Sequence, residues 1–435
     1  MKPRDRQILQ IALPSIVSNI TVPLLGLIDV AIVGHLGSPA YIGAIAVGGM
    51  LFNIIYWVFG FLRMGTSGMT SQAYGKRDLP EITRLLLRSM GIGLAVACCL
   101  IVLQTPIRQT AFLLIHPTDE VRELATLYFH ICIWGAPAML GLYGLSGWYI
   151  GMQNSRVPMY IAITQNIVNI IASLSLVYFC GMKVAGVALG TLIAQYAGFL
   201  MGLVLWMNHY GKLRKYIVWK GIWQREAMIR FFQVNRDIFL RTLCLVAVTL
   251  FFTSAGASQG VIILAVNTLL MQLFTLFSYV MDGFAYAGEA LSGRYIGAQN
   301  REAFKDTTRH LFIWGGGMAV LFTLAYALGG NVFLGLLTNE QEVIIAADTY
   351  FYWALAIPVA GFAAFIWDGI FIGATATRGM LLSMAIAAIS FFALYYGLRP
   401  ILANHALWLA FLTYLFMRGL VQTGLSRKIF NKFFY

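Results

Sequence analysis

The chain has 435 residues, of which 60% are hydrophobic and only 11% are charged. Soluble domains carry nearer ~25% charged residues, so this composition excludes a water-soluble enzyme or binding module. The formal net charge of +13 would suggest a nucleic-acid partner in a soluble protein. Here the basic residues concentrate in the connectors between apolar runs, so we expect no nucleic-acid partner.

Twelve apolar runs are long enough to cross a bilayer as helices. They are continuous rather than alternating, which excludes a transmembrane barrel. The sequence therefore predicts an all-α integral membrane protein with twelve transmembrane helices. The predicted spans cover residues 8–33, 41–65, 84–106, 121–149, 157–180, 184–207, 236–255, 261–288, 307–329, 343–373, 379–400 and 402–424.

The distribution of basic residues sets the predicted orientation. If the N-terminus is cytoplasmic, most of the 30 Lys and Arg residues fall in cytoplasmic connectors or adjoining helix ends. Cytoplasmic loops of membrane proteins are enriched in these residues. We therefore expect a multi-pass protein of the cytoplasmic (inner) membrane with both termini in the cytoplasm. The basic residues left outside are Arg108, Arg122, Lys183 and Arg399.

The two halves of the chain repeat. The motif around Gly75 recurs around Gly297, and the motif around Gly151 recurs around Gly373, both at an offset of 222 residues. Each half has six spans, so both start on the same side, and such parallel repeats are typical of secondary transporters. The predicted divisions are an N-terminal lobe of residues 1–207, a cytoplasmic linker of residues 208–235 and a C-terminal lobe of residues 236–435.

One carboxylate, Asp29, lies at membrane depth in the first predicted helix. A charge there costs from ~2.5 to more than 10 kcal/mol, so such a residue indicates a functional site. The alternative is that Asp29 lies near a helix end and reaches water. The residues that share its helical face, which suits a bundle interior, are Ser15, Ser18, Val22 and Gly26.

The same helix contains Pro14 and Pro23. Each proline removes a backbone donor and favours a kink, which is what a hinge needs. The alternative is that prolines are simply common in membrane helices.

Polar residues in the fourth to sixth spans are candidate partners for this carboxylate. Asn166, Asn169 and Ser173 share one face of the fifth span. An unpartnered amide in hydrocarbon costs several kcal/mol, so they should meet each other, water or the carboxylate, unless they only join helices. Thr191 and Tyr128 are weaker candidates, because Thr usually bonds its own helix and a membrane Tyr is often interfacial.

The second half has its own acidic residues. Asp282, Tyr286 and Glu289 form a stripe at the end of the eighth span, where Glu289 is expected to be interfacial. Asp368 in the tenth span and Asp282 lie deeper, and are either functional or paired with Arg241 or Arg294.

A second interpretation concerns Arg241 itself. Its spacing of four residues from Asp237 predicts a salt bridge at the start of the seventh span.

No catalytic constellation is evident. The six histidines are dispersed, the five cysteines show no metal spacing, and neither HExxH nor GxxxxGK[ST] occurs. We therefore predict a transporter rather than an enzyme, with no catalytic residue, metal or cofactor. Buried carboxylates without a nucleotide loop favour ion-coupled movement, whereas a lipid-modifying enzyme would have to rely on Asp282 and Glu289.

Several stretches carry a family resemblance over essentially the whole chain: SNITVPLLGLID at 18–29, DGFAYA at 282–287 followed by Glu289, and DGIFIGA at 368–374. They resemble the multidrug and toxic compound extrusion (MATE) family and its DinF-like branch. The resemblance implies a V-shaped antiporter of two six-helix lobes, which exports amphipathic, often cationic compounds against inward H⁺ or Na⁺ flow. Membrane lipids and such substrates are the expected partners, and a monomer is expected.

The resemblance also assigns roles. It implies that Asp29 is the coupling carboxylate, that the first helix bends at Pro14, and that Tyr128, Asn169 and Thr191 are partners of the site.

The chain departs from the family pattern at Ser173, where the family usually has a second aspartate. A dehydrated Na⁺ prefers several oxygens with compensating charge, whereas a proton needs one carboxyl group. We therefore favour H⁺ coupling, with a Na⁺-coupled exporter as one alternative. A flippase for lipid-linked precursors is another, but it should have a wide basic cavity, and Arg63 is the one arginine identified within a span.

Overall fold

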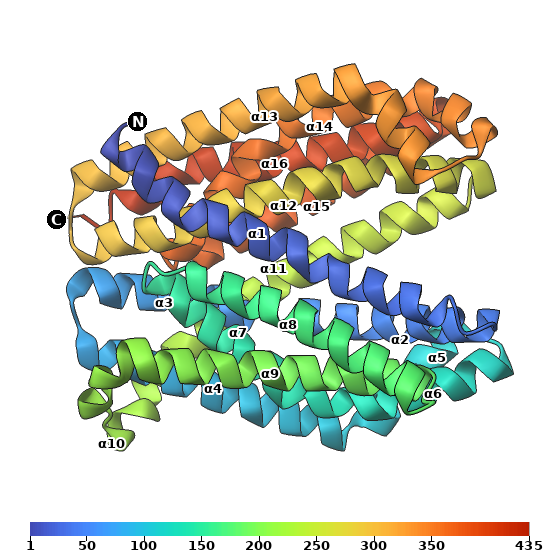
Figure 1. Ribbon diagram of the computed structural model, residues 1–435. Helices are drawn as coiled ribbons and strands as arrows, with labels where there is room; N and C mark the ends of the chain where they lie inside the picture. The colour runs from blue at the N-terminus through green and yellow to red at the C-terminus, as the bar shows by residue number, and fades with distance from the viewer. Residues whose placement is uncertain (435) are drawn as a thin grey trace. The chain divides into compact units, whose positions relative to one another are not determined.

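The structure is a computed structural model that describes residues 1–434 as helices joined by short connectors (Figure 1). Twelve helical segments are long and apolar enough to cross a membrane, which confirms the predicted all-α class and the number of spans. The second span is interrupted at Phe59 and Gly60, and the fifth ends in a π-helical turn, Ser175–Phe179. A short helix, α5 (Gln104–Ile115), follows the third span and was not predicted.

The chain folds as two compact units. The first unit is Val17–Phe231, and the second unit joins Met1–Ile16 to the chain from Phe232 onward. The boundaries therefore fall inside two helices, α1 (Pro3–Val33) and α11 (Arg225–Ala257). The predicted division instead placed residues 1–16 with the first half, because hydropathy does not reveal which bundle the start of a helix joins.

The other elements alternate along the chain with short turns. Those of the first unit are α2 (Pro39–Val58), α3 (Phe61–Lys76), α4 (Leu79–Val102), α5 (Gln104–Ile115), α6 (Asp119–Cys132), η1 (Ile133–Gly135), α7 (Ala136–Gly151), α8 (Arg156–Leu174), η2 (Ser175–Phe179), α9 (Val184–Tyr210), η3 (Gly211–Tyr216) and α10 (Trp219–Ile222). Those of the second unit are α12 (Val261–Gly297), α13 (Arg301–Leu337), α14 (Gln341–Gly373), α15 (Thr377–Leu402) and α16 (Asn404–Phe430).

The repeat predicted from the sequence is present in the backbone. Arg77, just after α3, has a left-handed conformation with φ of 57°, and Gln299, 222 residues later, has φ of 55°. Gln153 and Thr375 form a second such pair, with φ of 67° and 54°. Left-handed residues commonly end helices, so corresponding helices end in the same way in both units.

Helix packing repeats as well. A β-carbon at Gly147 of α7 would collide with the backbone of Arg63 in α3. A β-carbon at Gly369 of α14 would collide with the backbone of Ala285 in α12. Both contacts are related by the same offset of 222 residues. A glycine in each unit therefore lets two helix backbones approach closely, as small residues do in membrane bundles.

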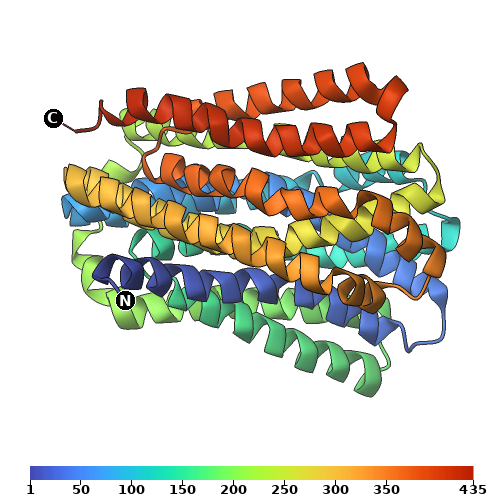
Figure 2. The ribbon, with the colours of Figure 1, turned by 90° about the horizontal axis from the view of Figure 1, so that it is seen from above.

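The core of the second unit contains several aromatic rings among aliphatic side chains. Phe252 of α11 packs edge-on against Trp408 of α16, with ring centroids 5.0 Å apart. Figure 2 shows α15 and α16 side by side, and they share an extensive contact. At one end of this core, Asn267 and Asn404 exchange two side-chain hydrogen bonds of 2.9 Å, and Trp408 donates a third to Asn267. These buried amides are fully partnered and join α12 to α16.

Part of the predicted linker packs on the first unit. Arg88 of α4 is 1% exposed, and its Nε donates a 2.9 Å hydrogen bond to the carbonyl of Ile222 in α10. The space beside Gly91 of α4 is taken by the Trp223 ring. The linker is therefore anchored to α4 rather than free along its length.

Candidate ion-coupling site

Asp29 lies near the carboxyl end of α1 and is 4% exposed. The Asn169 Nδ2 of α8 donates a hydrogen bond of 2.9 Å to Asp29 Oδ1. The Thr191 Oγ1 of α9 donates a hydrogen bond of 3.1 Å to the other oxygen, Oδ2. Three helices of the first unit therefore converge on one carboxylate, and two of them, α8 and α9, run side by side (Figure 1). Despite its place near a helix end, the carboxylate is shielded from water.

Both partners of Asp29 are neutral. No Lys, Arg or His among residues 1–434 forms an ion pair with it. A buried carboxylate held only by an amide and a hydroxyl has no countercharge within the protein. Its charge can be balanced by a proton or by a bound cation.

The Asn169 amide is oriented by the hydroxyl group of Ser173 and by that of Thr191. Its Oδ1 accepts a hydrogen bond of 3.2 Å from Ser173 Oγ and a longer one of 3.5 Å from Thr191 Oγ1. The amide nitrogen is thereby directed at the carboxylate. Ser173 is fully buried and acts on Asp29 through Asn169 rather than by direct contact.

Asn166 does not bond to the carboxylate. Its Nδ2 donates to the carbonyl of Thr21 in α1, at 3.1 Å, and to the carbonyl of Ala162 in its own helix, at 3.0 Å. Its Oδ1 is buried and has no hydrogen-bond partner. Asn166 therefore ties α8 to α1 about two turns before Asp29, and leaves one oxygen unsatisfied.

Tyr128 is buried near the end of α6, with 5% of its surface exposed. Its ring occupies the space beside Gly48 of α2 and lies 6.2 Å from the ring of Phe52. It is close enough to interact electrostatically with Asp29. Tyr128 is thus a wall of the site rather than a hydrogen-bond donor to its carboxylate.

The predicted polar face of α1 is covered only at its ends. Ser15 is 3% exposed and Asp29 4%, whereas Val22 between them is 56% exposed and no atom lies within 4 Å of a β-carbon built on Gly26. The uninterrupted burial expected from the helical spacing is therefore wrong. Spacing identifies the residues that share a face but not whether a neighbouring helix covers it.

The corresponding place in the second unit has no carboxylate. The 222-residue offset relates Asp29 to Phe251, and relates Asn169 and Ser173 to Phe391 and Tyr395. Thr191 corresponds to Thr413. The ring of Phe251 lies 5.9 Å from that of Phe391 and 5.3 Å from that of Tyr395, edge-on in both pairs. These positions therefore meet in both units, but in the described residues only the first unit places a carboxylate there.

The second unit holds its deep carboxylate differently. Asp368 Oδ2 accepts hydrogen bonds from Arg241 Nη2 at 2.6 Å and Arg418 Nη2 at 2.5 Å, and Oδ1 accepts one from Gln422 at 2.7 Å. All four residues are at most 7% exposed. Asp368 is therefore fully occupied by two guanidinium groups, which is the pairing alternative given by the sequence.

This pairing overturns two sequence expectations. Arg241 does not bond to Asp237, whose carboxylate accepts instead from Arg236 at 3.2 Å and Thr377 at 3.1 Å. Arg63 is not the only arginine within the spans, because Arg241 and Arg418 are buried there too. The spacing along α11 favoured a local pair of Asp237 with Arg241, whereas the acceptor of Arg241 is Asp368 on α14.

The remaining acidic residues of the second unit lie on α12. Asp282 is partly buried and close enough to Arg418 for electrostatic attraction. Tyr286 is also partly buried, and Glu289 is 1% exposed. Among residues 1–434 there is no group of three or more His, Cys, Asp or Glu side chains that could hold a metal ion.

Comparison with known proteins identifies the class and then the family. The MatE family model matches residues 14–174 and 238–397, once in each half of the chain. DNA damage-inducible protein F of Escherichia coli (strain K12) is 39% identical over 432 residues, which cover 98% of this chain and 92% of that protein. Multidrug and toxin extrusion protein 2 of Mus musculus is 23% identical over 76% of this chain and 57% of that protein.

Solved structures share the fold. A crystal structure of MATE in the bent conformation superposes with a TM-score of 0.89 at 17% identity, over 99% of this chain and 96% of that one. A Vibrio cholerae MATE transporter in the bent form superposes with a TM-score of 0.86 at 16% identity, over 99% of both chains. The protein is a multi-pass membrane transporter and not an enzyme. It belongs to the MATE family, in its DinF-like branch, as the sequence predicted.

Proposed function

We propose that this chain is a proton-coupled antiporter that exports amphipathic or cationic toxic compounds across the cytoplasmic membrane by alternating access. Asp29 is the coupling carboxylate. The observation that carries this proposal is a buried carboxylate with neutral hydrogen-bond partners only. The names of relatives that refer to multidrug and toxin extrusion support the substrate class.

The coupling follows from the cost of an unbalanced charge. An ionised carboxylate in an apolar bundle is unfavourable, and binding of a proton or an organic cation relieves it. If the proton and the organic cation compete for Asp29, each favours a different arrangement of the helices. The protein then exchanges protons for substrate across the membrane and does not let either pass alone.

A proton fits the surroundings of Asp29 better than Na⁺ does. The Asn169 carbonyl oxygen already accepts two hydroxyl groups, and Ser173 supplies no second negative charge. A Na⁺-coupled exporter is the second candidate, because the buried and unbonded Oδ1 of Asn166 is an oxygen that a cation could use. The flippase alternative is less supported, since the buried Arg241 and Arg418 are held by Asp368.

The hinge in α1 is proposed to lie at Pro14. The two compact units divide between Ile16 and Val17, just after this proline. A proline removes one helical hydrogen bond and weakens the helix there. Bending at this point would change how the Asp29 half of α1 meets α8 and α9.

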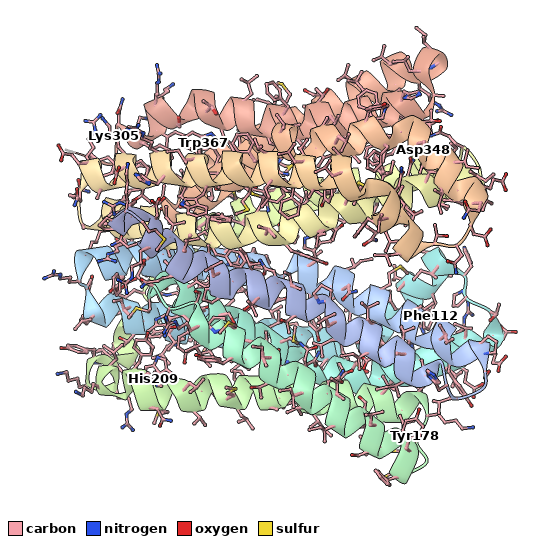
Figure 3. The ribbon with its side chains drawn as sticks, turned by 45° about the horizontal axis from the view of Figure 1, so that its top comes forward. Phe112, Tyr178, His209, Lys305, Asp348 and Trp367 are labelled. Carbon is pink, nitrogen blue, oxygen red and sulfur yellow. The ribbon has the colours of Figure 1, made fainter. Side chains whose placement is uncertain are left out.

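The decisive experiment is efflux of a fluorescent organic cation by the Asp29→Asn variant in cells that lack other pumps, and in proteoliposomes with an imposed pH gradient. We expect gradient-driven efflux to be lost while the protein remains in the membrane. The matched control is Asp348→Asn, the same change at an exposed acid near one end of α14 (Figure 3), which should transport normally. Unchanged efflux by the Asp29 variant would refute the assignment.

The coupling ion is tested separately. Proteoliposomes with a Na⁺ gradient and no pH gradient should not drive uphill transport, whereas a pH gradient without Na⁺ should. Robust transport under the first condition would establish the Na⁺-coupled alternative instead. Labelling of cysteines introduced near each terminus from the two sides of the membrane would test the proposed cytoplasmic termini.

A further inference from the structure

A cavity of about 560 Å³ lies in the second unit where α1 begins. It is bounded by the first turn of α1, the end of α12 and the first turns of α13. Lys305 in Figure 3 marks this end of the unit, and Asp348 marks the opposite end. None of the residues that line the cavity bonds to Asp29, and nothing in the transport proposal uses the cavity.

The cavity is lined by more positive than negative side chains. Lys2, Arg4 and Arg309 line it, and Asp306 is the one acidic residue that does. Asp306 is already engaged, since its carboxylate pairs with Arg4 at 3.0 Å and with His310 at 3.3 Å. In the part of the chain that the structure describes, Lys2 and Arg309 form no direct ion pair, although Arg309 is close enough to attract the Asp306 carboxylate. Neither cationic group is held by a direct contact with an acid, so both can bind a ligand.

The framework around these cations is held in place. Arg4 Nη1 donates to Tyr295 Oη at 2.6 Å and to Gln7 Oε1 at 2.9 Å. Tyr295 Oη in turn donates to Gln7 at 2.9 Å. On the other side of Arg4, His310 Nδ1 bonds to Asp5 at 2.7 Å. These bonds fix the start of α1 against α12 and α13, so the cavity has defined walls.

Two helix N-termini add to the positive potential. Pro3 opens α1 and Asn300 caps α13, and both residues line the cavity. Helix N-termini carry partial positive charge and exposed N–H groups, which favour anions. The volume lies within the ~300–1,000 Å³ range of small-ligand sites, so it can hold a phosphate group together with part of a larger molecule.

We propose that this cavity binds a phosphate group, supplied by the head group of an anionic phospholipid or by free phosphate. Lys2 and Arg309 are the principal cationic contacts. In the proposed orientation the cavity faces the cytoplasmic leaflet, where anionic lipids concentrate and basic pockets between helices bind their head groups. An occupant would bridge α1 to α13 and so strengthen the attachment of the first sixteen residues to the second unit.

The test measures binding and not transport, so its outcome is independent of the coupling proposal. Purified full-length protein is titrated with phosphatidylglycerol or phosphatidylcholine by native mass spectrometry, and with inorganic phosphate by calorimetry at constant ionic strength. The test variant is Lys2→Gln with Arg309→Gln. The charge-matched control is Arg301→Gln with Lys305→Gln, two exposed residues of α13 that do not line the cavity.

We expect phosphatidylglycerol to bind in preference to phosphatidylcholine. Each lost cation should weaken binding about fivefold, the equivalent of ~1 kcal/mol for a basic residue near an anionic surface. The double test variant should therefore bind roughly 25-fold more weakly, and each single variant about fivefold, while the control pair stays within about twofold of the unsubstituted protein. Lys2 and Arg309 are both exposed, so these variants should fold normally.

The two sources give different results. Preference for phosphatidylglycerol with no measurable binding of inorganic phosphate assigns the site to the lipid. Binding of inorganic phosphate with the same dependence on Lys2 and Arg309, without preference between the lipids, assigns it to the free anion. Equal losses in the test and control pairs, or no loss in the test pair, would overturn the proposal.

Discussion

Asp29→Asn and Asp368→Asn are the same chemical change at two buried carboxylates, but we expect a small effect on stability at Asp29 and a large loss at Asp368. At Asp29 an asparagine keeps both contacts, because its carbonyl accepts from Asn169 and its NH₂ donates to the Thr191 hydroxyl. The change also removes an unbalanced buried charge. The free energy of unfolding should therefore change by less than ~1 kcal/mol.

At Asp368 the same change leaves two guanidinium groups without their countercharge. Arg241 and Arg418 are 6% and 3% exposed, so water cannot replace the carboxylate. Breaking a buried ion pair by removing one partner typically costs ~3–5 kcal/mol. For a unit of this size, ~1 kcal/mol shifts the melting temperature by about 2–4 °C, so a decrease of roughly 6–20 °C follows.

The assay is thermal unfolding of the purified protein in one detergent, monitored by tryptophan fluorescence. Asp348→Asn serves as a control, because Asp348 is exposed and substitutions on the surface usually change stability by less than ~0.5 kcal/mol. Equal melting temperatures for the Asp29 and Asp368 variants would show that the two carboxylates do not differ in how far neighbouring positive groups balance their charge. A large loss at Asp29 would show that its charge is balanced in a way the structure does not contain.

Four further substitutions test close packing and individual hydrogen bonds. Gly147→Ala should lower the free energy of unfolding by about 1–3 kcal/mol, because the added β-carbon meets a backbone. Gly397→Ala, with open space around it, should raise that free energy by up to ~1 kcal/mol. Shifts of the melting temperature in the reverse directions would contradict the close contact at Gly147. Ser173→Ala should cost ~0.5–1.5 kcal/mol yet retain pH-driven efflux, and loss of efflux would give Ser173 a direct role. Arg88→Gln should accelerate tryptic cleavage of the linker, since its bond to Ile222 is lost; an unchanged digestion rate would argue against anchoring.

The fold was largely predictable because hydropathy and repetition are properties of the sequence alone. Runs of about twenty apolar residues identified the spans, and the recurrence of Gly75 as Gly297 identified two related halves. The left-handed residues Arg77 and Gln299 show that this recurrence reflects helix ends. Membership of the first sixteen residues in the second unit was not predictable, because it depends on contacts made by Arg4 and Asp5 with residues about 300 positions away.

The candidate site was predictable in part. Asp29 was identified because a charged residue within an apolar run is energetically unfavourable in a membrane. The family resemblance added Asn169 and Thr191, which do contact it. Asn166 shares a helical face with Asn169, one turn away, but it bonds to the α1 backbone and not to Asp29. The spacing of the two residues in the sequence does not show which of them reaches the carboxylate. Arg418 was counted among the cytoplasmic-end basic residues, because its burial depends on a carboxylate from another helix.

The attachment of the start of α1 also constrains the order of assembly. Arg4 is synthesised near the beginning, yet its partner Asp306 follows 302 residues later. At ~5–20 residues per second, the ribosome needs roughly 15–60 s to make that partner. During this time Arg4 lacks the acidic residue with which it forms an ion pair in the folded protein. The first turns of α1 are thus synthesised long before the residues of α13 that hold them. The second unit can therefore be completed only when most of the protein has been synthesised.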